Sequence, residues 1–285
     1  MILISVSACS SQPSEPDPRV EAMLGGFEQP EQELIVEMAT ELPGFEIQAV
    51  KPMKKVKPAG PPPPGMTVVP PRDPSAEKKL EEGTARVAIA SDLEVSDDFK
   101  ESIIELDLLR PITNLRLRSD RMGDEDLDFL GELSEVDFLS LQCPKISDQL
   151  LEEIAQMKNL VELRFENCPI TDAGLARLSG LERLHILWLK NTEVTGSGFA
   201  ELTNLKTLQF VVLSGSPVDD DGLLAISGMP SIMSLQLDGT DVTDRGLKHV
   251  PNMKNLFLLN VEGTEVTNRG AGELRLRNKK LQLLY

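Results

Sequence analysis

The residues of this chain that could serve catalysis are its three cysteines and two histidines. Cys168 and His185 would supply a nucleophile and a base, which must come within hydrogen-bonding reach to act together. The repeat described below separates them by about seven strand residues, which corresponds to about 23 Å. This spacing excludes a Cys–His dyad, and His249 falls in the helical half of its repeat. The sequence therefore predicts no catalytic residue.

Aspartate recurs at one fixed place in the pattern, at Asp124, Asp148, Asp172, Asp220 and Asp244. Stacked carboxylates could hold Ca²⁺, because hard cations prefer oxygen ligands. Carboxylates are also favoured at the N-terminus of a helix, where they meet the positive end of the helix dipole, and we prefer this interpretation. The chain has no phosphate-binding loop, zinc-ligand spacing or dinucleotide fingerprint, so we expect neither a metal nor a cofactor.

A repeat of 24 residues positions all of these side chains. Its first residue is apolar in every copy: Leu115, Leu139, Leu163, Leu187, Val211, Leu235, Leu259 and Leu283. A second apolar residue two positions later indicates a strand with one buried face, and later apolar residues three apart indicate a helical turn. Helix-capping residues and a recurring glycine lie between them, and we expect close packing at the glycine. One copy buries too little apolar surface to fold alone, so the copies must stack in a linear array.

One more column completes the pattern, five positions into the later copies: Cys168, Thr192, Ser216, Thr240 and Thr264. The pattern L-x-x-L-x-L-x-x-(N/C/T)-x-L resembles the leucine-rich repeat, and the variant T-x-V-T-D-x-G-L is similar to its bacterial type. The resemblance covers about residues 86–285. It implies a right-handed, curved α/β solenoid with a parallel sheet on the concave face. It also implies that the side chains of this column point inward and hydrogen-bond the turn backbones of adjacent coils.

The repeat array is expected over residues 115–285. The chain before it divides into three predicted segments. Residues 1–9 are interpreted as a partial lipoprotein signal, in which V-S-A-C resembles a lipobox and Cys9 would carry the lipid. The apolar run is short and no basic residue precedes it, so either the reading frame starts upstream or Cys9 belongs to a cytoplasmic tail. Residues 10–84 are acidic and then proline-rich, which predicts a disordered linker. Residues 85–114 keep a degenerate pattern and are expected to form an N-terminal capping repeat.

Composition narrows the classes of function. The formal net charge of −17 argues against binding of nucleic acid or anionic membrane by the chain as a whole. Three cysteines are too few for a disulfide framework. Cys143 and Cys168 are expected to be buried free thiols, with a bridge between them as the alternative. No stretch approaches the length of a membrane-spanning helix, and we expect a monomer.

Partner recognition is expected on the concave face of the sheet, through the residues that alternate with the buried leucines. The central row contains Arg116, Ser140, Arg164, Trp188 and Val212, and the rows beside it contain Phe138, Ile186 and Phe210 on one side and Gln142 and Glu166 on the other. An apolar patch rimmed by charge indicates an interface, and tryptophan and arginine are frequent hot-spot residues. The predicted binding residues are Arg116, Phe138, Arg164, Ile186, Trp188, Phe210 and Val212. The alternatives are that the tether folds back over this patch, or that its residues are neutral surface apolars.

The leading hypothesis is a non-catalytic scaffold that binds a protein, or alternatively a glycan, on its concave face. We expect it to be exported and held at the cell envelope by a lipid on Cys9, with a cytoplasmic location as the alternative. A structural envelope protein without a specific ligand and a substrate-adaptor-like regulator are the other hypotheses. Partner enrichment that depends on Trp188 separates the scaffold from the purely structural protein.

Overall fold

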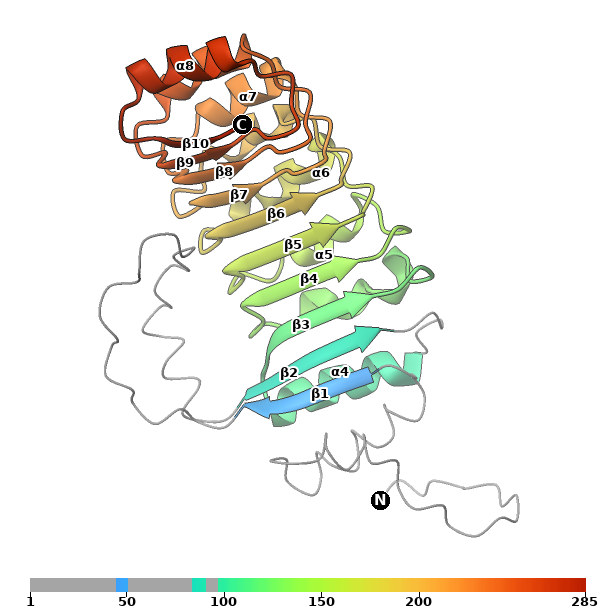
Figure 1. Cartoon of the computed structure of the whole chain (residues 1–285). Helices are drawn as coiled ribbons and strands as arrows, with labels where there is room; N and C mark the ends of the chain where they lie inside the picture. The colour runs from blue at the N-terminus through green and yellow to red at the C-terminus, as the bar shows by residue number, and fades with distance from the viewer. Residues whose placement is uncertain (1–44, 51–83, 91–96) are drawn as a thin grey trace, which may run out of the picture.

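The computed structural model describes residues 45–50, 84–90 and 97–285. In this part of the chain ten strands form one sheet in chain order (Figure 1). The strands from β2 to β10 are parallel, and each is joined to the next by a helical segment. This architecture confirms the predicted leucine-rich repeat solenoid with a parallel sheet. Crossovers between parallel strands of one sheet are as a rule right-handed. The lipobox with Cys9 and most of the expected linker lie outside the described residues.

The bounds of the elements follow the 24-residue period. The strands are β1 (Phe45–Val50), β2 (Thr84–Ala90), β3 (Ile112–Arg118), β4 (Phe138–Gln142), β5 (Glu162–Glu166), β6 (Ile186–Lys190), β7 (Phe210–Val212), β8 (Ser234–Gln236), β9 (Leu258–Asn260) and β10 (Gln282–Leu284). The α-helices are α4 (Asp97–Leu109), α5 (Leu150–Ile154), α6 (Asp172–Leu175), α7 (Asp220–Ser227) and α8 (Asn268–Arg277). The 3₁₀ helices are η1 (Asp124–Asp126), η2 (Asp128–Glu132), η3 (Ala176–Gly180), η4 (Ser197–Leu202), η5 (Gly246–Lys248) and η6 (Val250–Asn252).

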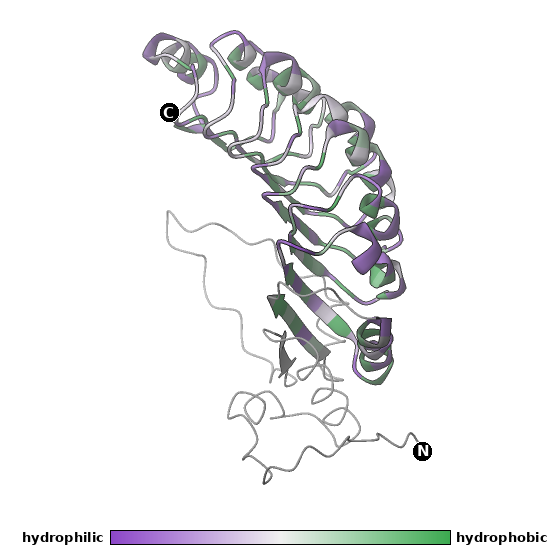
Figure 2. Ribbon diagram, turned by 90° about the vertical axis from the view of Figure 1, so that its right-hand side faces the viewer, coloured by the Kyte–Doolittle hydropathy of each residue, from purple (hydrophilic) through white to green (hydrophobic). Residues whose placement is uncertain are grey.

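The molecule is an arc with the strands along its inner side and the helices along its outer side (Figure 2). Helices are wider than strands, so stacking them side by side bends the sheet away from them. The first leucines of successive repeats pair directly across the sheet, as Leu139 with Leu163 and Leu163 with Leu187, and are fully buried. The predicted buried row is therefore confirmed, and it forms one continuous core.

The N-terminal end of the sheet contains a strand that was not expected. β1 pairs antiparallel with β2, with Phe45 opposite Ile89 and Val50 opposite Thr84. The prediction of a linker without regular structure over 10–84 therefore needs correction at 45–50. The alternation of Phe45, Ile47 and Ala49 with polar residues is the period of a strand, and this signal could have revealed it.

Aspartates at or near the start of five helical segments join neighbouring coils. Asp172 accepts hydrogen bonds from the Thr195 amide and hydroxyl, both at 2.8 Å, and from the amides of Gly196 (3.1 Å) and Gly198 (2.7 Å). Other aspartates of the column bind the Ser or Thr of the next coil in the same way, at Asp124, Asp148, Asp220 and Asp244. The carboxylates therefore satisfy amide donors of the following coil, a role that the helix dipole alone did not predict.

One coil departs from this scheme and compensates for it. Gly196 occupies the position of the aspartate, and Asp219 replaces the threonine of the following coil. Asp219 caps its own helix, accepting a hydrogen bond of 2.8 Å from the Gly222 amide. A Cβ at Gly222 would collide with the Thr195 carbonyl oxygen, which confirms the close packing expected at the recurring glycine.

Cys143 and Cys168 are buried free thiols, as expected, in adjacent coils. The Cys143 amide donates to Cys168 Sγ at 3.4 Å, and the Cys168 thiol donates to the Leu141 carbonyl oxygen at 3.4 Å. Burial raises the pKa of the Cys143 thiol to about 12 and also raises the pKa of Cys168. Both side chains therefore act as small core residues that bond turn backbones.

Candidate functional site

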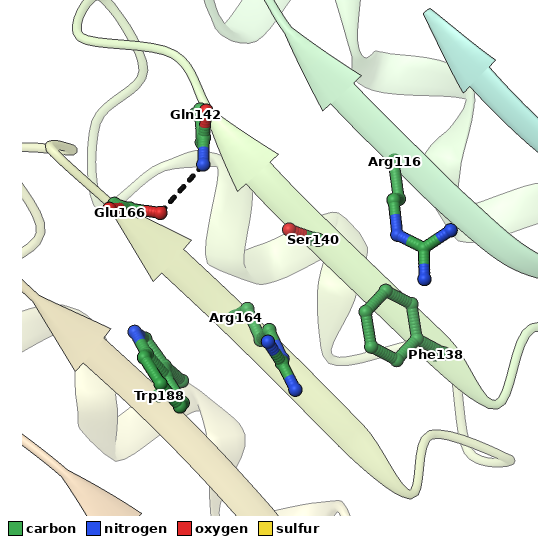
Figure 3. Close-up of a pocket in the computed structure, with 7 residues that line it drawn as sticks. All are labelled: Arg116, Phe138, Ser140, Gln142, Arg164, Glu166 and Trp188. Atoms are coloured by element: carbon green, nitrogen blue, oxygen red, sulfur yellow. Dashed lines mark hydrogen bonds between the residues drawn. The ribbon is translucent and has the colours of Figure 1, made fainter.

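Arginine and aromatic side chains alternate across four neighbouring strands on the concave face (Figure 3). The Arg116 guanidinium on β3 lies over the Phe138 ring on β4, 4.8 Å from its centroid. The Arg164 guanidinium on β5 lies 5.3 Å from the same centroid and 4.8 Å from the Trp188 ring on β6. Such cation–π contacts contribute about 0.5–1 kcal/mol each at exposed sites. We call these four residues the Arg–aromatic ladder.

The strand register explains how the ladder forms. Ser140 pairs with Arg116 on one side and with Arg164 on the other, so all three occupy one row of the sheet. Because Ser140 is small, both arginines can reach Phe138, which lies two residues earlier on the same strand. The gap above Ser140 is a pocket of about 270 Å³. Its lining consists of Arg116, Phe138, Ser140, Gln142, Arg164, Glu166 and Trp188.

Two ion pairs hold the charged side chains beside the ladder. Arg164 pairs with Glu162 on its own strand. Lys190 on β6 pairs with Glu166 at 2.8 Å, and the Gln142 amide donates to the same carboxylate at 2.6 Å. The Lys190 hydrogen bond is the main cause that holds the pKa of Glu166 below its usual value. Glu166 is therefore an anchored anion that orients Gln142 and Lys190.

The structure brings together four of the seven residues predicted for the binding face. Arg116, Phe138, Arg164 and Trp188 line the pocket. The other three continue the face beyond it: Ile186 is on β6, and Phe210 and Val212 are on β7. Trp188, Ile186 and Phe210 are half-buried rather than fully exposed.

Val212 needs correction, because only 7% of its surface is exposed. It faces the concave side as the alternation predicts, but it pairs with Trp188 on one side and Gln236 on the other. These two larger side chains flank it in the same row of the sheet. Val212 therefore supports the neighbouring side chains and presents little surface to a partner.

Ser140, Gln142 and Glu166 belong to the pocket but were not selected from the sequence. Their positions in the concave rows were clear from the repeat. The predicted binding residues were chosen for apolar or arginine side chains, so these three residues were not included. A small residue between two long ones nevertheless indicates a hollow in the surface. The signal that could have found them is the size pattern along the row Arg116–Ser140–Arg164.

Metal-ligating side chains do not converge in the described part of the chain. Among residues 45–50, 84–90 and 97–285, no group of three histidine, cysteine or acidic side chains could hold a metal ion. His185 Nδ1 lies 2.7 Å from the Arg183 carbonyl oxygen. Within the same residues, no helix combines the length and apolar character needed to cross a membrane.

Comparisons with known proteins agree with this architecture. Residues 156–179 match the model of a family described as Leucine Rich repeat. No curated protein matches the chain. Among solved structures, internalin C2 of Listeria monocytogenes superposes with a TM-score of 0.50 and 18% identity, over 68% of this chain and 76% of that chain.

A second internalin of Listeria monocytogenes, inlF, gives a TM-score of 0.49 at 17% identity, over 64% of this chain and 49% of its own. The matched region thus spans about half of that internalin. At such identity a likeness establishes the fold alone. The register, the matched repeat and the likeness to internalin C2 together show that the chain folds as a leucine-rich repeat solenoid.

Proposed function

We propose that this protein is a non-catalytic scaffold that binds a partner protein on the concave face of β3–β7, with the Arg–aromatic ladder as its centre. The observation that carries the proposal is the ladder itself, which connects β3, β4, β5 and β6 through three cation–π contacts. The ladder fixes long side chains before any partner arrives. Pre-ordered side chains lose less entropy on binding, so they contribute more of their contact energy to affinity.

The chemistry of the ladder favours a protein ligand. Tryptophan and arginine are enriched among the residues that dominate protein–protein affinity, and such residues cluster near the centre of an interface. Half-buried Ile186 and Phe210 extend the apolar area next to Trp188, and Glu162 and Lys190 form a charged border. An apolar centre with a polar rim is the usual composition of an interface.

A capture experiment with two matched variants tests the proposal. Trp188→Ala removes the half-buried ring from the concave face, and Leu224→Ala removes a side chain that is 47% exposed on α7, on the helical side. The full chain and both variants are used to enrich proteins from source cells, and the enriched proteins are quantified by mass spectrometry. The proposal predicts a partner that is lost with Trp188→Ala and retained with Leu224→Ala. A partner that both variants retain, or one lost only with Leu224→Ala, contradicts it.

We also propose that the protein is exported and anchored at the cell envelope through a lipid on Cys9. The support is the V-S-A-C stretch and the polar segment that follows it, both of which lie outside the described residues. Mass spectrometry of the mature N-terminus tests this proposal directly. Cleavage before Cys9 with an added acyl mass supports it, and an intact Met1 with an unmodified Cys9 contradicts it.

A further inference from the structure

The concave face carries a local excess of positive charge on a chain whose net charge is −17. Five basic side chains project from this face of β2–β6, namely Arg86, Arg116, Arg118, Arg164 and Lys190, and two acidic ones, Glu162 and Glu166. Arg164 and Lys190 are paired with those two carboxylates. Arg86, Arg116 and Arg118 have no ion-pair partner among the residues that the structure describes. Arg118 also acts on the Glu166 carboxylate from a longer distance. Arg86 and Arg116 are therefore the cations of the β2–β3 end that are complementary to an anionic ligand.

The far end of the same face has the opposite sign. Asp238 follows β8 and accepts hydrogen bonds from Ser214 (2.7 Å) and Asn260 (3.3 Å), and exposed Glu262 follows β9. The face is therefore polarised along the sheet. A partner that presented acidic groups to both ends would be repelled at one of them, so this polarity fixes the direction in which an acidic segment can lie.

Within the positive half, the pocket above Ser140 contains hydrogen-bond donors that have no acceptor in the described part of the chain. The Arg116 guanidinium lies over the Phe138 ring but has no hydrogen-bond acceptor among the described residues. The N–H donors of a guanidinium lie in its plane, so contact with a ring face leaves them free for an acceptor. The Ser140 hydroxyl forms the floor beside it and likewise has no partner within the described part of the chain.

We propose that this pocket takes the carboxylate of an acidic segment of the partner protein, bound by the Arg116 guanidinium and the Ser140 hydroxyl. This inference rests on the proposed function and names the group that the ladder recognises. The charge of the lining favours a monoanion. Arg164 and Glu166 already have partners of opposite charge, so Arg116 is the one uncompensated cation of the lining. A phosphate group carries a charge of about −1.5 to −2 and would find too little positive charge there.

The width of the ladder also predicts a spacing within the ligand. From β3 to β6 there are three strand intervals, or about 14 Å, which an extended peptide covers with about four residues. A segment whose carboxylate lies beside Arg116 therefore presents a side chain about four positions away to Trp188. Because Ile186 and Phe210 lie next to Trp188, that side chain is apolar.

Trp188 is the one tryptophan of the chain, so its intrinsic fluorescence reports on this site alone. The full chain is titrated with a short extended peptide in which Glu precedes Leu by four positions. A second peptide has Gln in place of Glu, and a third has phosphoserine. The proposal predicts that the Glu peptide binds about tenfold or more tightly than the Gln peptide, since hydrogen bonds to a charged group are the strong ones. It also predicts weaker binding of the Glu peptide as salt is added.

Three variants locate the contact. Arg116→Gln removes the charge, and Ser140→Phe fills the pocket without changing the charge. Lys248→Gln, on the helical side in η5, is the matched control, because it removes one positive charge far from the concave face. Affinity for the Glu peptide should fall about tenfold in both concave-face variants and remain unchanged in Lys248→Gln. If Ser140→Phe does not fold, Arg116→Gln still provides the test.

Several outcomes would overturn the inference. These are equal affinity for the Glu and Gln peptides, tighter binding of the phosphoserine peptide, or unchanged affinity in Arg116→Gln. Trp188 emission that responds to salt without peptide, with the response lost in Arg116→Gln, would identify the chain's own carboxylates as the occupant. If the Glu peptide does not bind while partner capture still depends on Trp188, the carboxylate pocket is refuted and the proposed scaffold function is not. If partner capture is also independent of Trp188, both the carboxylate pocket and the proposed function are refuted.

Discussion

Replacing Asp172 by alanine tests whether the aspartate column holds the coils together. The Asp172 carboxylate is the acceptor for three backbone amides and one hydroxyl of the next coil. Alanine leaves all four donors without this acceptor. It also leaves η4, the helical segment of that coil, without the anion at its N-terminus.

The expected loss follows from the number of bonds. At a net value of about 0.5–1.5 kcal/mol for each hydrogen bond, four bonds correspond to about 2–6 kcal/mol. Thr195 is exposed, so water replaces part of the lost acceptor, and we expect the lower part of this range, about 2–4 kcal/mol. This is a large share of the unfolding free energy of about 5–15 kcal/mol that is usual for a domain.

Urea unfolding measures this loss with two independent probes. Circular dichroism follows the whole array, and Trp188 fluorescence follows β6, in the same coil as the donors Thr195, Gly196 and Gly198. The matched control is Asp241→Ala, which removes the same charge at an exposed position whose side chain forms no hydrogen bond in the described part of the chain. If Asp172→Ala unfolds within about 0.5 kcal/mol of Asp241→Ala, the usual range for a neutral surface change, the reasoning is refuted.

Three further predictions concern glycine packing, pH and the thiols. Gly222→Ala should lower the unfolding free energy by about 1–3 kcal/mol or more, because the added Cβ meets a backbone oxygen of the preceding coil. Gly272→Ala on α8 should raise the unfolding free energy by about 0.5–1 kcal/mol, because nothing lies within 4 Å of the added Cβ. Thermal unfolding of the two variants measures both effects. Hydrogen bonds from Thr267 hold the pKa of Asp244 below its ordinary value of 3.8, so its stabilisation is complete above that pH and is lost as the pH falls through the lowered pKa. The native chain should therefore have a higher unfolding free energy than Asp244→Asn above pH 3.8, and this difference should shrink at lower pH. A difference in unfolding free energy that stays constant with pH would contradict this. Cys143 and Cys168 should resist a thiol reagent in the folded chain at mildly alkaline pH and react after denaturation, as peptide mass spectrometry can show; rapid native labelling of either would contradict their burial.

The 24-residue period was sufficient to predict the parallel strands of the repeats, their register and the buried row. Each copy repeats the same spacing of apolar residues, so a position that is ambiguous in one copy can be assigned from the other copies. Leu163, for example, must pair with Leu139 and Leu187 once the three copies stack, and it does. The alternation along each strand then determines which side chains face inward toward the core and which face the concave side.

The features that the sequence did not reveal depend on contacts between coils. The low exposure of Val212 results from the size of its neighbours on two other strands, which alternation along one strand does not report. The bridging role of Asp172 likewise requires the next coil to be placed above it. The pocket above Ser140 depends on side-chain sizes on neighbouring strands, because Ser140 lies between Arg116 and Arg164 in one row of the sheet. β1 lies outside the period, so the repeat gave no reason to expect it.

Side-chain oxidation by hydroxyl radicals, compared between the free protein and its complex with the captured partner, tests the central claim most directly. The account predicts that Trp188 and Phe138 on the concave face oxidise more slowly in the complex. Leu224 on α7 and Leu276 on α8, which are 47% and 78% exposed on the helical side, should oxidise at unchanged rates. Protection of Leu224 or Leu276 with no change at Trp188 would show that the partner binds elsewhere and would contradict the account.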